Sequence, residues 1–137
     1  MKREIKFRAW DTENEIWLNY IKLSCSGEMM TAGDNEMIPI QNPERVVIMQ
    51  FTGLLDRLGK EVFEGDLVSW SNKTYTIKWY EKIASFVMEE GENKLERPSM
   101  KLQSQVIGIE LQSKVIGNIY ESKHLLDNTD TKVRTNL

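Results

Sequence analysis

Three glycines spaced six residues apart, Gly53, Gly59 and Gly65, constrain the fold of this chain more than any other feature of its sequence. Each is followed by a short run of apolar or polar residues, which is typical of a chain that reverses direction repeatedly. In Glu64-Gly65-Asp66, the glycine can adopt the positive φ of a tight turn, and the Asp66 carboxylate can accept nearby backbone N–H bonds. The pattern predicts short strands joined by tight turns, with Asp66 in a structural role where a strand begins.

The N-terminal part of the chain predicts a hairpin followed by an irregular connection. Residues 4–10 alternate, with Ile5, Phe7 and Ala9 on the face that we expect in the core, and residues 16–23 are apolar enough to form the second strand. We expect the two tryptophans that flank the turn, Trp10 and Trp17, to contact each other across the hairpin. Residues 24–43 are rich in glycine, proline and small polar residues, so we expect an irregular connection there, with one short strand at 37–40.

The rest of the chain predicts a β-meander. Residues 45–51 are continuously apolar, as in a buried strand, and residues 67–70 and 74–80 form the clearest hairpin, with another strand at 84–88. On this hairpin Tyr75, Ile77 and Trp79 share a face, and we expect Trp70 and Trp79 in the core. Such a meander is the nucleus of a small barrel.

Charged and repeated segments follow. Residues 89–101 are highly charged and predict an exposed loop. The tripeptide Val-Ile-Gly then occurs twice, at 106–108 and 115–117, which predicts two paired strands in which Gly117 forms a bulge or a close backbone approach. Ser122 is expected to cap a last helical turn through Leu126.

Four blocks of sequence together resemble the YopX family of phage and prophage proteins. They are Arg3–Asp11, Gln50–Leu54 with Asp56, Gly59–Val68 and Val115–Glu121. The resemblance covers roughly residues 3–126. It implies a phage-encoded cytoplasmic protein with a small, mainly β, SH3-like barrel region, and it implies no established biochemical activity and no catalytic residues.

The fold class that we predict is therefore mainly β, with little helix. We expect one β domain over residues 1–126, in which residues 1–45 form the added hairpin and irregular segment and residues 46–126 form the SH3-like barrel region. Residues 127–137 lack periodicity and apolar anchors, so we expect a flexible tail.

Composition excludes several classes of protein. One cysteine, Cys25, and one histidine, His124, are too few for a structural zinc site in one chain, so we expect no metal and no cofactor. Cys25 has no imidazole partner nearby in sequence, and His124 suits a surface or capping role. The N-terminus has no secretory signal, and no apolar run of about 20 residues is present to cross a membrane, so we expect a location in the cytoplasm of the host cell.

Catalysis is disfavoured by the same kind of argument. Glu61, Glu64 and Asp66 lie close together in sequence, and paired carboxylates can share general acid and base chemistry. The plainer interpretation is that Asp66 caps the turn while Glu61 and Glu64 face solvent. Because no phosphate loop, nucleophile elbow or dinucleotide fingerprint is present, we expect that the protein is not an enzyme.

Two functions stay open. The first is a non-enzymatic interaction module that binds a protein partner or itself, because residues 11–45 hold seven acids and two bases while the first ten residues are basic. The second is nucleic-acid binding through lysine and arginine side chains that lie beside aromatic residues on the expected strands. The residues of that possible nucleic-acid surface are Lys2, Arg3, Lys6, Arg8, Trp10, Lys73 and Lys78. The net charge of −3 gives no general attraction for nucleic acid, so such binding would need a local patch.

Overall fold

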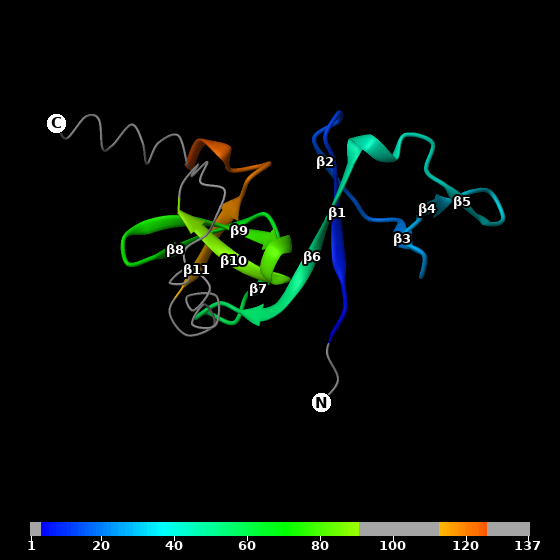
Figure 1. The fold of residues 1–137 in the computed structure, drawn as a ribbon. Helices are drawn as coiled ribbons and strands as arrows, with labels where there is room; N and C mark the ends of the chain where they lie inside the picture. The colour runs from blue at the N-terminus through cyan, green and yellow to red at the C-terminus, as the bar shows by residue number, and fades with distance from the viewer. Residues whose placement is uncertain (1–3, 91–112, 126–137) are drawn as a thin grey trace. The chain divides into compact units, whose positions relative to one another are not determined.

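The structure is a computed structural model that describes residues 4–90 and 113–125, and these are mostly β-strand (Figure 1). In these ranges helix is limited to two 3₁₀ turns, η1 (Pro43–Arg45) and η2 (Glu81–Ile83), and to residues 123–125. The predicted mainly β class with little helix is confirmed.

Contacts divide the chain into two compact units. Unit 2 is Lys6–Gln50, and unit 1 combines Met1–Ile5 with Phe51–Leu137. The boundary falls inside β6 (Val46–Leu55), whose first half belongs to unit 2 and whose second half belongs to unit 1. The single domain over residues 1–126 stays a prediction, and the tail at 127–137 lies outside the described residues.

Unit 2 contains two groups of antiparallel strands. In the first, β1 (Phe7–Asp11) lies between β2 (Ile16–Leu18) and the first half of β6. The predicted contact across the β1–β2 hairpin is confirmed, because Trp10 pairs with Trp17 and their ring centroids lie 4.8 Å apart in an edge-to-face arrangement. The second group is a three-stranded sheet in the order β3 (Ile21–Leu23), β4 (Met29–Ala32) and β5 (Met37–Pro39).

Unit 1 contains the predicted meander. Its sheet has the order β10 (Ser85–Glu90), β9 (Lys73–Tyr80), β8 (Asp66–Trp70) and β11 (Lys114–Asn118), and all neighbours are antiparallel. This order is compatible with the SH3-like barrel that we expected. The second half of β6 pairs with β7 (Glu61–Phe63). The hairpin between β8 and β9 turns at Ser71 and Asn72, which both have positive φ, as two-residue hairpin loops require.

The core of unit 1 lies on this sheet. It contains Val62, Val68, Tyr75, Ile77, Val87, Met88 and Val115. These residues come from β7, β8, β9, β10 and β11, so burial of their side chains joins all five strands. The hydrophobic effect is the main force that holds unit 1 together.

The glycines have different positions in these elements. Gly59 and Gly65 have φ of +82° and +86° and lie in turns. Gly53 was expected in a reversal, and this expectation is wrong: Gly53 lies within β6, at an irregularity between Phe51 and Leu55 where φ is +86°. A bulge bends a strand without ending it, which is why a turn-like glycine lies inside a continuous strand.

Gly117 lies at a register shift in β11, where an added Cβ would overlap the Ser122 side chain. In the described residues, β11 pairs with β8. The repeat copy at 106–108, with which we expected β11 to pair, lies outside the described residues. Of the loop expected at 89–101, residues 91–101 also lie outside them, whereas Glu89 and Glu90 belong to β10, so the loop does not begin at residue 89. The backbone oxygen of Ser122 accepts the N–H of Leu125 at 2.9 Å.

Candidate functional site

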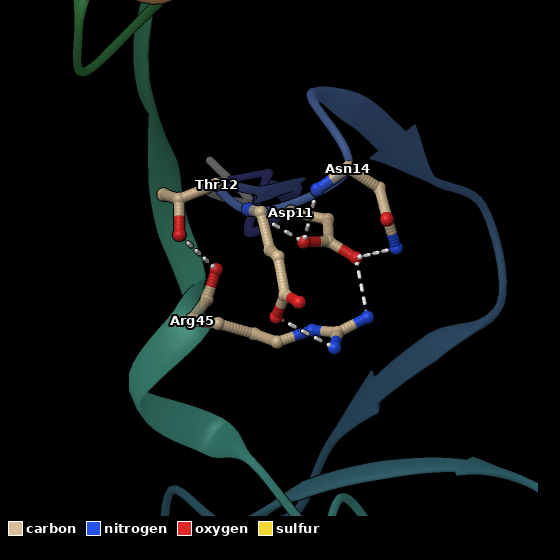
Figure 2. A network of polar contacts seen from close by, with 5 residues as sticks. Asp11, Thr12, Asn14 and Arg45 are labelled. Atoms are coloured by element: carbon tan, nitrogen blue, oxygen red, sulfur yellow. Dashed lines mark hydrogen bonds and ion pairs between the residues drawn. The ribbon is translucent and has the colours of Figure 1, made fainter.

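An ion pair at the end of β1 is the best defined polar feature of unit 2. Asp11 is the last residue of β1, and Arg45 ends η1, directly before the residue of β6 that pairs with Asp11. One guanidinium nitrogen of Arg45 lies 2.8 Å from Asp11 Oδ2, and the other lies 3.1 Å from Glu13 Oε2 (Figure 2). Arg45 therefore joins two carboxylates that are more than 30 positions away in sequence.

Backbone donors hold the Asp11 carboxylate in place. Its Oδ1 accepts the N–H groups of Glu13 and Asn14 at 2.9 and 3.1 Å, and its Oδ2 accepts the Asn14 side-chain amide at 3.0 Å. The Asn14 N–H is the largest influence on the pKa of Asp11, and together with Glu13 and Arg45 it outweighs the opposing effect of burial, so this pKa is lowered. Asp11 is therefore ionised at neutral pH and its oxygens are engaged, which suits a fixed structural anion and not a general base.

The same connection is strengthened by Thr12. Its N–H and its hydroxyl both donate to the backbone oxygen of Arg45, at 2.9 and 2.8 Å (Figure 2). The turn after β1 and the residue before β6 are thus joined by side chain and backbone together.

A pocket of about 280 Å³ opens beside the ion pair. Its walls combine apolar and polar side chains, and they are Asp11, Leu18, Ile21, Thr31, Ile40, Gln41, Asn42, Arg45 and Val46. All of them belong to unit 2. A concave site with apolar walls and a few fixed polar groups is typical of a binding site for a side chain or a small ligand.

One face of the three-stranded sheet continues from this pocket. Ile21 pairs with Thr31, Thr31 pairs with Ile38, and Leu23 pairs with Met29, so these five side chains share one face of the sheet. We call it the β3–β5 face. Leu23 and Ile38 are 42% and 40% exposed, and Ile21 and Thr31 also line the pocket.

The possible nucleic-acid surface is only partly described, because Lys2 and Arg3 lie outside the described residues. Arg8 lies with its guanidinium carbon 4.8 Å from the centre of the Trp17 ring and also donates to Met49 Sδ. Trp10 was expected to be presented to nucleic acid, and this is wrong: it is 5% exposed. Since Ala9 is buried as well, β1 is covered on both of its faces at this point.

On the β8–β9 hairpin of unit 1, the two lysines of the possible nucleic-acid surface form ion pairs with glutamates. Lys73 lies 3.5 Å from Glu90, and Lys78 lies 3.2 Å from Glu89. Lys6 is half-buried and belongs to unit 2, whereas Lys73 and Lys78 belong to unit 1.

Two core expectations are also wrong. Trp79 is 46% exposed and packs edge-to-face on Phe86, although Tyr75 and Ile77 on the same strand face are buried. Ile5 is 77% exposed because β1 begins after it, at Phe7. Burial does not follow the alternation of the sequence in these strands, because neighbouring residues are buried in β1 at Ala9 and Trp10 and in β9 at Tyr75, Thr76 and Ile77.

The three central acids have different environments. Asp66 is buried and its Oδ2 accepts the Phe63 N–H at 2.8 Å, which is the kind of turn-capping bond that we expected. Glu61 and Glu64 are half-buried. Burial, followed by the charge of Glu64, raises the pKa of Tyr120, so that phenol stays protonated at neutral pH.

The sequence interpretation missed two buried carboxylates, Asp11 and Asp56. Asp56 accepts the N–H groups of Leu58 and Lys60, each at 2.8 Å, and that of Val115 at 2.9 Å. The turn signals around Asp11 and Asp56 were visible, since both begin short polar segments that Asx turns favour. Nothing local pointed to their distant partners, Arg45 and Val115.

The remaining candidates give no composite site. Cys25 and His124 are exposed. In residues 4–90 and 113–125, no group of three or more histidine, cysteine, aspartate or glutamate side chains is arranged to hold a metal ion. In the same residues, no helix has the length and apolar character needed to pass through a membrane.

Comparison with known proteins identifies similar chains. A family model described as YopX protein matches residues 6–127. A similar solved structure is the crystal structure of protein EF1440 from Enterococcus faecalis, which is 26% identical and has a TM-score of 0.59, with 91% of this chain and 99% of that chain covered. A search of curated proteins finds no match.

Proposed function

The chain belongs to the YopX family, and within that family we propose that it is a non-enzymatic interaction module that binds a protein partner or a second copy of itself. The phage origin and the location in the host cytoplasm, which the resemblance implies, are parts of the same proposal. The similarity to the solved structure of protein EF1440 covers 91% of this chain and supports a shared fold.

The observation that carries the proposal is the exposure of the three-stranded sheet. In the described residues, none between Thr12 and Ile48 is buried, and this range includes all of β3, β4 and β5. A three-stranded sheet normally needs an apolar face packed against something else. The β3–β5 face carries apolar side chains that remain partly exposed, and such faces are typical of protein interaction sites.

The proposal predicts that Ile38→Ser removes an interaction of the full-length protein, whereas Ile83→Ser does not. Ile38 and Ile83 are 40% and 37% exposed, so they are matched in residue type and exposure, but Ile83 lies in η2 of unit 1. Self-association is measured by light scattering over a range of concentrations. Binding of another protein is measured by quantitative capture from the cells that naturally encode the chain.

The expected result is a dimer, or a captured protein, that is retained by wild type and Ile83→Ser and lost with Ile38→Ser. A protein that stays monomeric and captures nothing in an Ile38-dependent manner would overturn the proposal.

Nucleic-acid binding is the alternative function. The exposed Trp79 ring favours it, because bases stack on accessible aromatic side chains. The pairing of Lys73 and Lys78 with acids disfavours it, since a cation engaged by a carboxylate neutralises less phosphate charge.

We therefore expect no salt-dependent binding in a tryptophan fluorescence titration with single-stranded and duplex oligonucleotides at two salt concentrations. Binding that weakens steeply as salt rises, and that is lost in Trp79→Ala, would support the alternative and would count against the interaction module.

A further inference from the structure

We propose that the β3–β5 face and its adjoining pocket bind a segment of another protein in which large apolar side chains are flanked by lysine or arginine. This inference rests on the proposed function and names the chemistry of the partner. It depends on three properties of unit 2, which are the apolar face, the pocket that continues from it and the charges around both.

The face provides contact area without an internal core. Ile21, Leu23, Met29 and Ile38 lie on it together, with Thr31 at the centre of the row formed by Ile21 and Ile38. Methionine side chains are flexible and adapt to partners of different shape, and Met29 is half-exposed here. A partner with large apolar side chains would remove this area from water.

The pocket provides a place for an anchoring side chain. Ile21 and Thr31 belong both to the face and to the pocket wall, so an apolar side chain bound on the face is adjacent to the pocket. The pocket lining also contains Asp11 and Arg45, which form an ion pair of 2.8 Å, and backbone N–H groups hold the Asp11 carboxylate. A rigid wall of this kind lowers the entropy cost of binding, because it needs no ordering when the partner arrives.

The charges around the face are mainly negative. Between Arg8 and Arg45 the sequence contains one base, Lys22, and its side chain points to the opposite side of the sheet from those of Ile21 and Leu23. The loops that join the strands carry exposed acids, namely Glu28, Asp34 and Glu36.

At the pocket the balance is negative as well. One guanidinium, that of Arg45, lies against the two carboxylates of Asp11 and Glu13, and the lowered pKa of Asp11 keeps its carboxylate charged. A partner with flanking bases complements these charges, whereas an acidic partner is repelled.

The test is a selection of random dodecapeptides displayed on a carrier against the immobilised full-length protein, followed by binding measurements with the selected peptides. We expect enrichment of peptides that combine large apolar residues with lysine or arginine. We expect Ile38→Ser, and independently Leu23→Ser on the neighbouring strand, to weaken their binding by about tenfold or more.

Charge variants test the second half of the inference. Glu36→Lys should weaken binding of the same peptides by about threefold at low salt, and the difference should shrink as salt rises. The matched controls are Ile83→Ser and Glu81→Lys, which change an exposed isoleucine and an exposed acid in η2 of unit 1 and should leave binding unchanged. Circular dichroism checks that each variant is folded.

Each outcome has a distinct meaning. Selected peptides that are acidic or uncharged, but still depend on Ile38, would overturn this inference and leave the interaction module standing. A dimer of the wild type that dissociates in Ile38→Ser would identify a second copy as the occupant, and would overturn the inference in the same way. Peptides whose binding ignores Ile38 and Leu23, together with a monomeric protein, would overturn both proposals.

Discussion

Replacing Asp56 by alanine is expected to lower the free energy of unfolding by about 3 kcal/mol, measured by urea denaturation at neutral pH. The Asp56 side chain is buried and accepts three backbone N–H groups. The N–H of Val115 is buried, so loss of its hydrogen bond to Asp56 costs about 1–3 kcal/mol. Leu58 and Lys60 are exposed, and water can replace the lost carboxylate as the partner of their N–H groups. Loss of each of these two hydrogen bonds therefore costs about 1 kcal/mol.

The control for this prediction is Asp34→Ala, which removes an exposed acid from the loop before β5. This change should alter the free energy of unfolding by less than about 0.5 kcal/mol. Equal urea midpoints for wild type and Asp56→Ala would show that the carboxylate does not join the turn at 56–60 to β11.

The pH dependence of this effect follows from the pKa of Asp56. Burial by itself raises this pKa, but the N–H groups of Val115, Lys60 and Leu58 and the charge of Lys60 outweigh it, so the pKa lies below its usual value of 3.8. A carboxyl group with a lowered pKa stabilises the folded state fully above its unfolded pKa, and this contribution is lost as pH falls through the folded pKa. The stability difference between wild type and Asp56→Ala should therefore be constant at neutral pH and shrink below about pH 4.

Ile77→Ala is expected to destabilise unit 1 by about 2–5 kcal/mol, whereas Trp79→Ala should cost about 1 kcal/mol. Ile77 is 1% exposed and belongs to the core cluster formed by side chains of β7, β8, β9, β10 and β11, so its truncation leaves a cavity. Trp79 lies two residues further along β9, is 46% exposed and packs on Phe86. The two substitutions on one strand face thus compare the core with its edge.

Urea midpoints of both variants, followed by far-ultraviolet circular dichroism, test this comparison. A larger loss for Trp79→Ala than for Ile77→Ala would mean that the tryptophan is part of the core after all. The expected order, with the larger loss for Ile77→Ala, is the opposite of what residue size suggests, because burial and not side-chain volume determines the cost of truncation.

The candidate site illustrates how remote residues are brought together. β6 pairs with β1 in a register that sets Val46 opposite Asp11, and this places Arg45 beside the turn that follows β1. The ion pair and the Thr12 bonds then fix the pocket wall from two sides. A pocket built in this way depends on strand pairing, so we expect substitutions that disturb β1 or β6 to change the shape of the pocket even where they replace none of its lining residues.

Much of the local structure could be predicted from the sequence. The turn at Gly65 with Asp66, the β8–β9 hairpin, the short strand near Met37 and the contact of Trp10 with Trp17 were all anticipated. These features depend on glycine φ preference, on side-chain alternation and on the register of one hairpin. Each is decided within a few residues, which is why periodicity and turn chemistry are sufficient.

The candidate site could not be predicted in this way. The sequence places Trp10 on a possible binding surface and Trp79 in the core, but Trp10 is buried and Trp79 is 46% exposed. The pocket forms instead around Asp11 and Arg45. Alternation shows which side chains share a face, but it does not show how far the core extends along that face.

The sequence by itself determined that this chain forms short antiparallel strands with tight turns, because backbone geometry and alternation act over a few residues. The tertiary structure alone decided which carboxylates are buried and what they bind. Asp56 reaches Val115 across 59 positions, and Asp11 reaches Arg45 across 34. Such pairs form only when non-neighbouring strands pack together, and no local pattern in the sequence specifies that packing.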